Sequence, residues 1–273
     1  GSDDGSPRRH SVSASDLLPF QASLEARRSS GGKCLVPYLT GGLPGWELML
    51  EAVASAGADG IEVGIPFSDP VMDGPIIQES SELALAAGAT PPGILDGLSR
   101  LDIGVPLAVM TYVNLVYRFG YERFADSMVK AGVSAAILPD MPLEEAGDWC
   151  CAADAAGVQT VMLAAPTTPD ERLLRVVERC GGFVYAVGLL GITGERDSLA
   201  ASAKVIAKRL KDVTDLPVLV GVGISTPEQA AEVCEVADGV VVGSAIVRRV
   251  LETGSPESVA DFVGSFREAL DKG

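Results

Sequence analysis

The sequence predicts an α/β protein folded as a (β/α)8 TIM barrel with an extra N-terminal helix. Eight short runs of strand length recur along the 273-residue chain, and segments of helical periodicity separate them. Most of the runs are continuous in Val, Ile and Leu, which is typical of parallel strands covered on both faces. Eight such units in about 250 residues match a closed barrel.

The expected strands are Cys34–Thr40, Gly60–Ile65, Pro106–Tyr112, Ala135–Asp140, Thr160–Ala164, Phe183–Val187, Pro217–Val222 and Gly239–Gly243. The expected helices are Trp46–Ala56, Pro75–Ala87, Pro91–Arg100, Tyr121–Ala131, Glu144–Ala156, Pro169–Arg179, Ala200–Val213, Pro227–Val236 and Pro256–Leu270, with the extra one at Asp16–Ala26. Three helices are expected to begin at a capping hydroxyl followed by proline: Thr168-Pro169, Thr226-Pro227 and Ser255-Pro256.

A doubly wound open sheet is the structural alternative. That fold normally shows a G-x-G-x-x-G turn after its first strand, followed by an acidic residue that binds a ribose. Here the first strand leads into Thr40-Gly41-Gly42-Leu43-Pro44-Gly45, whose glycines do not make this pattern. The barrel is therefore the preferred prediction.

One barrel domain is expected over residues 15–273. Residues 1–14 are polar and predict a disordered tail, and Gly1-Ser2 resembles the remnant of a tag. No apolar run approaches the roughly 20 residues that a membrane helix needs, and no charged-then-apolar leader opens the chain. These features predict a cytoplasmic protein.

Composition narrows the chemistry. The net charge of −16 argues against a nucleic-acid partner. The five cysteines lack metal-binding spacing, and the only histidine, His10, lies in the tail. No metal is therefore expected, and the reaction must use carboxylates, a tyrosine or a lysine.

A glutamate in an apolar strand is the most informative feature. In Gly60–Ile65, Glu62 shares one strand face with Gly60 and Gly64. Carboxylates are almost never fully buried without a partner, so the two glycines suggest space for a ligand beside it. Asp69 and Asp73 follow in the next loop. An acid near a strand end, facing acids on the next loop, predicts a catalytic site.

The last three strands each run into glycine. The turns are 188–194 after the sixth strand, 221–225 after the seventh and Gly243-Ser244 after the eighth. Barrels often bind phosphate at the loops after strands seven and eight, where backbone N–H groups and a helix N-terminus attract an anion. Such a site needs no Lys or Arg, which suits an acidic chain.

Several segments together resemble the tryptophan synthase alpha subunit over about residues 15–270. They are Val36-Pro37-Tyr38-Leu39-Thr40, Ile61-Glu62-Val63-Gly64-Ile65-Pro66-Phe67-Ser68-Asp69-Pro70, Asp73-Gly74-Pro75, Thr111-Tyr112-Val113-Asn114, Pro139-Asp140, Gly191-Ile192-Thr193-Gly194, Gly223-Ile224-Ser225 and Gly243-Ser244-Ala245. The block from Glu62 to Asp73 is the most specific of these. The resemblance implies cleavage of indole-3-glycerol phosphate to indole and glyceraldehyde 3-phosphate, a reverse aldol reaction.

The same resemblance implies the roles of individual residues. Glu62 is expected to be the general acid and base, Asp73 to accept the indole N–H, and Tyr185 to lie near the reacting carbon. The residues expected to bind substrate or its phosphate are Tyr112, Thr193, Gly194, Gly223, Gly243 and Ser244.

Each catalytic role has a structural alternative. Glu62 could pair with a lysine such as Lys33. Asp73 could cap the helix that starts at Pro75, and Tyr185 could simply pack in the core. The sequence also departs from the family pattern at Gly188, where a serine is usual, so closure of the sixth-strand loop is expected to be slower or entropically costlier.

The resemblance also implies a partner. The family's alpha subunit docks on a beta subunit that carries pyridoxal phosphate, so an alpha2beta2 heterotetramer is expected and no cofactor is expected on this chain. Pro66, Asp69 and Asn114 match the family's contact surface. Two functional alternatives stay open: a free-standing indole-3-glycerol-phosphate lyase, and a non-catalytic barrel that binds a phosphorylated ligand and activates its partner.

Overall fold

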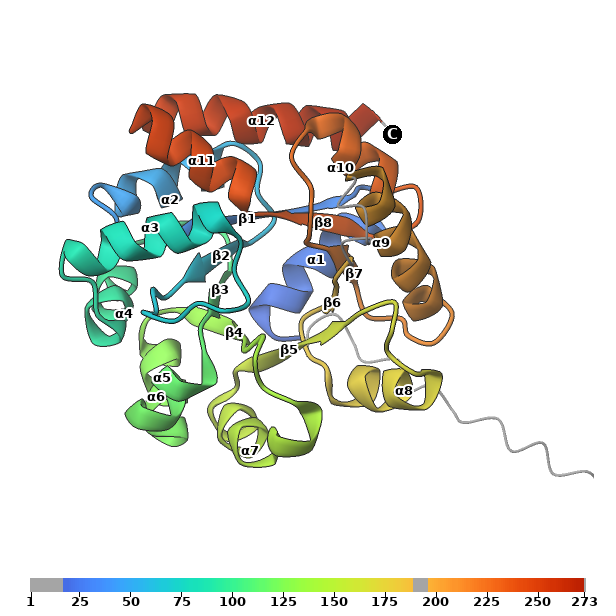
Figure 1. Ribbon diagram of the computed structural model, residues 1–273, viewed down its shortest axis with the longest axis horizontal. Helices are drawn as coiled ribbons and strands as arrows, with labels where there is room; N and C mark the ends of the chain where they lie inside the picture. The colour runs from blue at the N-terminus through green and yellow to red at the C-terminus, as the bar shows by residue number, and fades with distance from the viewer. Residues whose placement is uncertain (1–16, 189–195, 273) are drawn as a thin grey trace, which may run out of the picture.

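The chain forms a closed barrel of eight parallel strands, each hydrogen-bonded to the next in sequence order, with β8 returning to β1 (Figure 1). The computed structural model describes residues 17–188 and 196–272. The strands are β1 (Cys34–Thr40), β2 (Ile61–Gly64), β3 (Leu107–Met110), β4 (Val133–Ile137), β5 (Gln159–Ala164), β6 (Val184–Ala186), β7 (Val218–Val220) and β8 (Gly239–Val242). The predicted barrel is confirmed.

A layer of helices surrounds the barrel. It comprises α2 (Trp46–Ser55), α3 (Pro75–Ala86), α4 (Pro91–Ser99), α5 (Val113–Phe119), α6 (Tyr121–Lys130), the 3-10 turn η2 (Leu143–Glu145), α7 (Gly147–Ala156), α8 (Asp170–Arg179), α9 (Arg196–Lys211), α10 (Pro227–Val233), α11 (Ser244–Thr253) and α12 (Pro256–Lys272). The extra N-terminal helix, α1 (Pro19–Ser29), lies across the centre of the strand ring in Figure 1.

The sequence pattern and the structure differ mainly at the ends of elements. Seven strands are shorter than expected or begin and end at other residues, while β1 has its expected bounds. Helix α5 was not expected, because its seven residues follow strand β3 almost without a break. Thr226 caps α10 as predicted. Thr168 does not cap α8: its hydroxyl accepts the Ala165 N–H instead.

The alternation of side chains along the strands separates two cores. On β2, Ile61 and Val63 pack outward beneath the helices. The barrel interior is a second cluster, to which Phe20 and Leu24 of α1 contribute along with Phe183 and Tyr185. Glu62 therefore points into the barrel rather than under the helices. Within the described residues, no helix is long and apolar enough to cross a membrane.

Candidate active site

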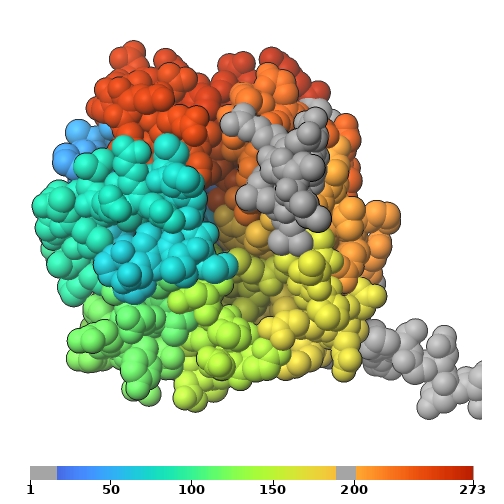
Figure 2. Space-filling model, in the orientation of Figure 1, coloured from blue at the N-terminus to red at the C-terminus, as the bar shows by residue number. Residues whose placement is uncertain are grey.

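A cavity of about 370 Å³ lies at the mouth of the barrel, where the strands end. The space-filling view shows a hollow at this end, beside the loop after β2 (Figure 2). Its walls are Tyr38, Glu62, Met72, Asp73, Gly74, Ile77, Met110, Ile137, Pro139, Leu163, Tyr185, Val187, Gly221, Val222, Gly223, Ile224, Ser225, Gly243 and Ser244. Apolar side chains from the middle strands thus face glycine turns from the last strands.

Glu62 is the buried carboxyl of this cavity. Only 1% of the residue is exposed, and its Oε2 atom has no hydrogen-bond partner among the described residues. Removal from water raises the pKa of Glu62 to about 8, and the nearby Asp73 carboxylate adds to the shift. Glu62 therefore holds a proton near neutral pH, as a general acid must. The Lys33 alternative is wrong, because Lys33 Nζ donates to the Ala237 carbonyl.

The glycines beside Glu62 make room for protein rings, not for ligand. A Cβ on Gly60 would lie 2.7 Å from the Phe20 ring, and one on Gly64 would collide with the Tyr38 hydroxyl. The expectation that these glycines clear space for a bound molecule is therefore wrong. They admit two aromatic side chains, one on each side of Glu62 along its strand face.

Asp73 is held at the cavity by Tyr112. The Tyr112 hydroxyl donates to Asp73 Oδ2 at 3.0 Å and accepts the Met72 N–H at 3.0 Å. Burial raises the pKa of Asp73, and the hydrogen bond from Tyr112 opposes that shift. The capping alternative for Asp73 is not supported, because the N-cap residue of α3 is Gly74 and no side chain caps the helix. Tyr112 itself lies behind Asp73 and does not line the cavity.

Asp140 supports this arrangement from the end of β4. Its Oδ1 atom accepts the Val113 N–H at 2.9 Å and so fixes the first residue of α5, next to Tyr112. Sequence reasoning left Asp140 outside the site. Its position after an apolar strand and the resemblance of Pro139-Asp140 to the family pattern were the available signals.

Two tyrosines stand over Glu62. Tyr38 from β1 and Tyr185 from β6 both line the cavity. Burial raises the pKa of each hydroxyl, and the Asp73 and Glu62 carboxyls add to both shifts. The Tyr185 ring occupies the space that a side chain at residue 221 would need, so only glycine fits there. Tyr185 thus lines the cavity as well as packing against Phe183 in the interior. Tyr38 belongs to the site although sequence reasoning gave it no role.

The cavity wall formed by the turns after β7 and β8, called the anion wall below, has the features of an anion site. Gly223, Gly243 and Ser244 come together there. Helix α11 begins at Ser244 without a side-chain cap, so N–H groups of its first turn remain available. Gly223 adopts a φ of +79°, which favours glycine. Thr193 and Gly194, also expected to bind phosphate, lie outside the described residues.

The expected partner-contact residues do not line the cavity. Asp69 and Asn114 are exposed, whereas Pro66 is buried. A larger hollow of about 860 Å³ lies between α6 and α7, but no strand end reaches it. Within residues 17–188 and 196–272, no three His, Cys, Asp or Glu side chains gather closely enough to hold a metal ion.

A buried acid, a second carboxylate and a glycine-lined anion wall at the C-terminal end of a (β/α)8 barrel define the class: a barrel enzyme that performs acid–base chemistry on a small phosphorylated compound. A family model for the tryptophan synthase alpha chain matches residues 24–270. The chain belongs to the tryptophan synthase alpha chain family, and it is a lyase of tryptophan biosynthesis that cleaves indole-3-glycerol phosphate.

Relatives and solved structures agree with this assignment. The tryptophan synthase alpha chain of Gloeobacter violaceus is 43% identical over 257 residues, which cover 92% of each chain. That of Methanosarcina mazei is 45% identical over 235 residues and 85% of each chain. A structure of Mycobacterium tuberculosis tryptophan synthase superimposes with a TM-score of 0.86 at 34% identity, covering 94% of this chain and 100% of that one.

Proposed function

We propose that Glu62 carries both proton transfers in the cleavage of indole-3-glycerol phosphate to indole and glyceraldehyde 3-phosphate. One observation supports this role above all: a carboxyl that is only 1% exposed, with an unpartnered oxygen among the described residues and a pKa raised to about 8, lines the cavity. A carboxyl in that state is protonated near neutrality and can donate.

Glu62 alone both supplies and regains the proton that the cleavage needs. Protonated Glu62 gives its proton to the indole carbon that bears the glycerol chain. The carboxylate so formed takes the proton from the hydroxyl that becomes the aldehyde. The bond between that indole carbon and the carbon that bears this hydroxyl breaks, and its electron pair restores the aromaticity of the indole ring. Glu62 is protonated again at the end.

Asp73 would stabilise the positive charge that develops on the indole ring. Its Oδ2 atom is engaged by Tyr112, which leaves Oδ1 to accept the indole N–H. Tyr185 would lie beside the reacting carbon, because it lines the same cavity as Glu62. The backbones of Gly223, Gly243 and Ser244 would hold the phosphate.

The test is Glu62→Gln, which keeps the shape of the side chain but cannot shuttle a proton. Indole release is measured from the purified chain, with Glu79→Gln, an exposed residue of α3, as the matched control. We expect the Glu62→Gln variant to lose at least about 10²-fold in kcat, while the control keeps normal turnover. Normal turnover in the Glu62→Gln variant would reject the assignment.

We further propose that the chain docks on a beta subunit in an alpha2beta2 assembly. Asp69 and Asn114 are exposed, and the large apolar side chains of Val71, Met72 and Tyr117 are exposed near them in sequence, at 79%, 58% and 70%. Pyridoxal phosphate would belong to the beta subunit. We also keep the prediction of a cytoplasmic location and of one domain over residues 15–273.

Titration with a beta subunit separates the synthase from a free-standing lyase. A large rise in indole release on adding the partner supports docking. High turnover by the isolated chain, unchanged by the partner, favours the free-standing enzyme.

A further inference from the structure

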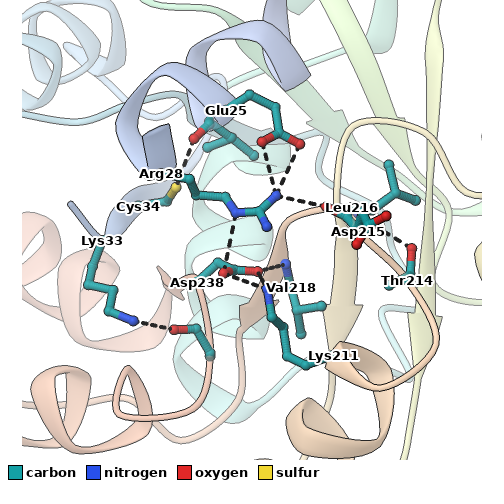
Figure 3. A network of polar contacts seen from close by, with 12 residues as sticks. Glu25, Arg28, Lys33, Cys34, Lys211, Thr214, Asp215, Leu216, Val218 and Asp238 are labelled. Atoms are coloured by element: carbon teal, nitrogen blue, oxygen red, sulfur yellow. Dashed lines mark hydrogen bonds and ion pairs between the residues drawn. The ribbon is translucent and has the colours of Figure 1, made fainter. Parts of the chain in front are cut away.

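Helix α1 is tied to the N-terminal end of the barrel at several points, which include the starts of β2, β5 and β8. Arg27 Nε lies 2.8 Å from Asp59 Oδ1, just before β2. Arg28 Nε lies 3.3 Å from Asp238 Oδ1, just before β8 (Figure 3). At the start of β5, the Gln21 N–H donates to Gln159 Oε1 at 3.1 Å. The helix therefore cannot slide or tilt without breaking one of these ties.

The two acids are themselves fixed to the strands. Asp59 Oδ2 accepts the Leu35 N–H of β1 at 2.9 Å. Asp238 Oδ2 accepts the Val218 N–H of β7 at 2.9 Å, and Lys211 approaches both oxygens of Asp238 at 2.8 Å (Figure 3). The ties to Asp59 and Asp238 thus join α1 to the backbone of β1 and β7.

This anchored helix inserts one ring into the barrel. Phe20 is fully buried in the interior cluster. Its ring fills the notch at Gly60, where a Cβ would lie 2.7 Å away. It also stacks on Phe183 with ring centroids 5.8 Å apart, and Phe183 in turn lies 5.7 Å from Tyr185.

The notch at Gly60 is next to Glu62 on the same strand face, since alternate residues of a strand share a face. Tyr38 covers the other side at Gly64. Glu62 is therefore flanked along β2 by Phe20 toward the N-terminal end and by Tyr38 toward the cavity mouth. Phe20, Phe183 and Tyr185 thus form a row of three neighbouring aromatic rings, which ends with Tyr185 at the cavity.

We propose that Phe20 is a positioning residue for the cleavage reaction: from the opposite end of the barrel it closes the interior behind Glu62 and, through Phe183, supports Tyr185 at the cavity. The inference rests on the proposed role of Glu62. It gives the N-terminal helix a part in catalysis although none of its residues lines the cavity.

Phe20 affects Glu62 because its ring keeps water out of the barrel interior. A smaller side chain at residue 20 leaves a void against Gly60, into which water or a shifted Phe183 ring can move. The free-energy cost of ionising Glu62 inside the barrel is then lower, and the pKa of Glu62 falls. The titratable groups that face Glu62 are Tyr38 of β1, Asp73 of the next loop and Tyr185 of β6; on β3 its neighbour is Ala108.

The experiment compares Phe20→Ala and the milder Phe20→Leu with Leu24→Ala. Leu24 is the matched control, because it is also fully buried on α1 and belongs to the same interior cluster. For each variant, kcat and KM for indole-3-glycerol phosphate are measured from about pH 5 to about pH 10, a range that spans the ordinary and raised pKa values of a buried carboxyl, and folding is checked by thermal unfolding.

We expect Phe20→Ala to lower kcat by about tenfold with little change in KM, because misplaced catalytic groups reduce turnover more than binding. The pH at which activity is lost on the alkaline side should fall by about one unit, and Phe20→Leu should show a smaller effect of the same kind. Leu24→Ala should lower the unfolding temperature but leave the pH profile in place. Equal profiles for the Phe20 and Leu24 variants would overturn the proposal.

A titration independent of activity provides the second readout. Carboxyl carbons labelled with 13C are followed by NMR, and Glu62→Gln identifies the signal of Glu62. The titration midpoint of Glu62 should move down in Phe20→Ala and stay in place in Leu24→Ala. An unmoved midpoint in a folded Phe20→Ala protein overturns the inference.

The two hypotheses fail in different ways. If Glu62→Gln still releases indole, the proposed role of Glu62 is lost, whatever the Phe20 variants do. If Glu62→Gln is inactive while Phe20→Ala keeps the normal pH profile and midpoint, only the role of Phe20 is rejected.

Discussion

At the scale of single residues, the site depends on one carboxyl that the fold keeps out of water. The pKa of Glu62 is raised from 4.5 to about 8, chiefly by burial. Between these values the folded protein keeps a proton that the unfolded chain releases. Unfolding therefore becomes easier as pH rises through this range. The raised pKa of Asp73 acts in the same direction.

The first prediction follows from this linkage. Glu62→Gln should be more stable than the unmodified protein at alkaline pH, because glutamine does not ionise in the cavity. The gain should grow between pH 4.5 and about 8 and reach the order of a few kcal/mol. Urea unfolding of both proteins at acidic, neutral and alkaline pH measures it. A difference that does not vary with pH would show that Glu62 is not buried in a protonated form.

The second prediction concerns Tyr112. Its hydroxyl ties Asp73 and the Met72 backbone to the end of β3, so Tyr112→Phe frees the carboxylate. We expect kcat to fall by about tenfold or more, with a stability loss of only about 1 kcal/mol. Steady-state kinetics of the isolated chain give the result. Tyr117→Phe, an exposed tyrosine on α5, is the control and should match the unmodified protein.

At the scale of elements, the N-terminus of α10 fixes the turn after β7, which forms part of the anion wall. The side chain of Gln229 accepts the N–H groups of Ser225 and Thr226, at 2.8 and 3.2 Å, within the capping box of α10. These bonds fix the end of the turn that follows β7. They also occupy the Ser225 N–H, so among the described residues the amides that we assign to the phosphate lie at Gly223, Ile224 and the start of α11.

The third prediction tests this role of the cap. Gln229→Ala should cost about 1 kcal/mol of stability and should also weaken phosphate binding, because the turn loses its fixed shape. The rise in unfolding temperature with added inorganic phosphate reports binding. Glu232→Ala, on the same helix and engaged in an exposed ion pair with Lys204, should keep the full phosphate effect. Equal protection in both variants would contradict the prediction.

At the scale of the whole molecule, one buried carboxylate contacts both the first and the last helix. Asp59 binds Arg27 of α1 and Arg267 of α12, at 2.8 and 3.2 Å, and accepts the Leu35 N–H of β1. The residue is only 7% exposed. The first and last helices are thereby both joined to β1 through this side chain, in addition to the other ties of α1.

The fourth prediction is a large loss of stability in Asp59→Asn. Removing this charge leaves the buried Arg267 guanidinium with less compensation, which costs about 3 kcal/mol or more. Asp96→Asn, which breaks an exposed pair with Arg100, should change stability by less than about 0.5 kcal/mol. Denaturant midpoints of the two variants make the comparison. Similar midpoints would show that the Asp59 cluster does not stabilise the fold.

Much of this architecture could be predicted before the structure, because hydrophobic periodicity reports which residues are buried. Eight apolar runs indicated the strand count, and the acid in β2 marked the site. Hydrophobic periodicity did not predict the short helix α5, which has only seven residues and no loop of its own before it. It also did not predict the role of Tyr112, since that role depends on a contact between residues 39 positions apart.

The barrel, its inward-facing acid and the glycine turns at the ends of the last strands follow from the amino-acid sequence alone, because periodicity and backbone freedom are local properties. What fills the space around that acid depends on the tertiary fold. Gly60 and Gly64 look alike in the sequence, yet one admits a ring from the N-terminal helix and the other a ring from β1. Which side chains meet inside a closed barrel depends on how distant segments pack, and no local pattern records that.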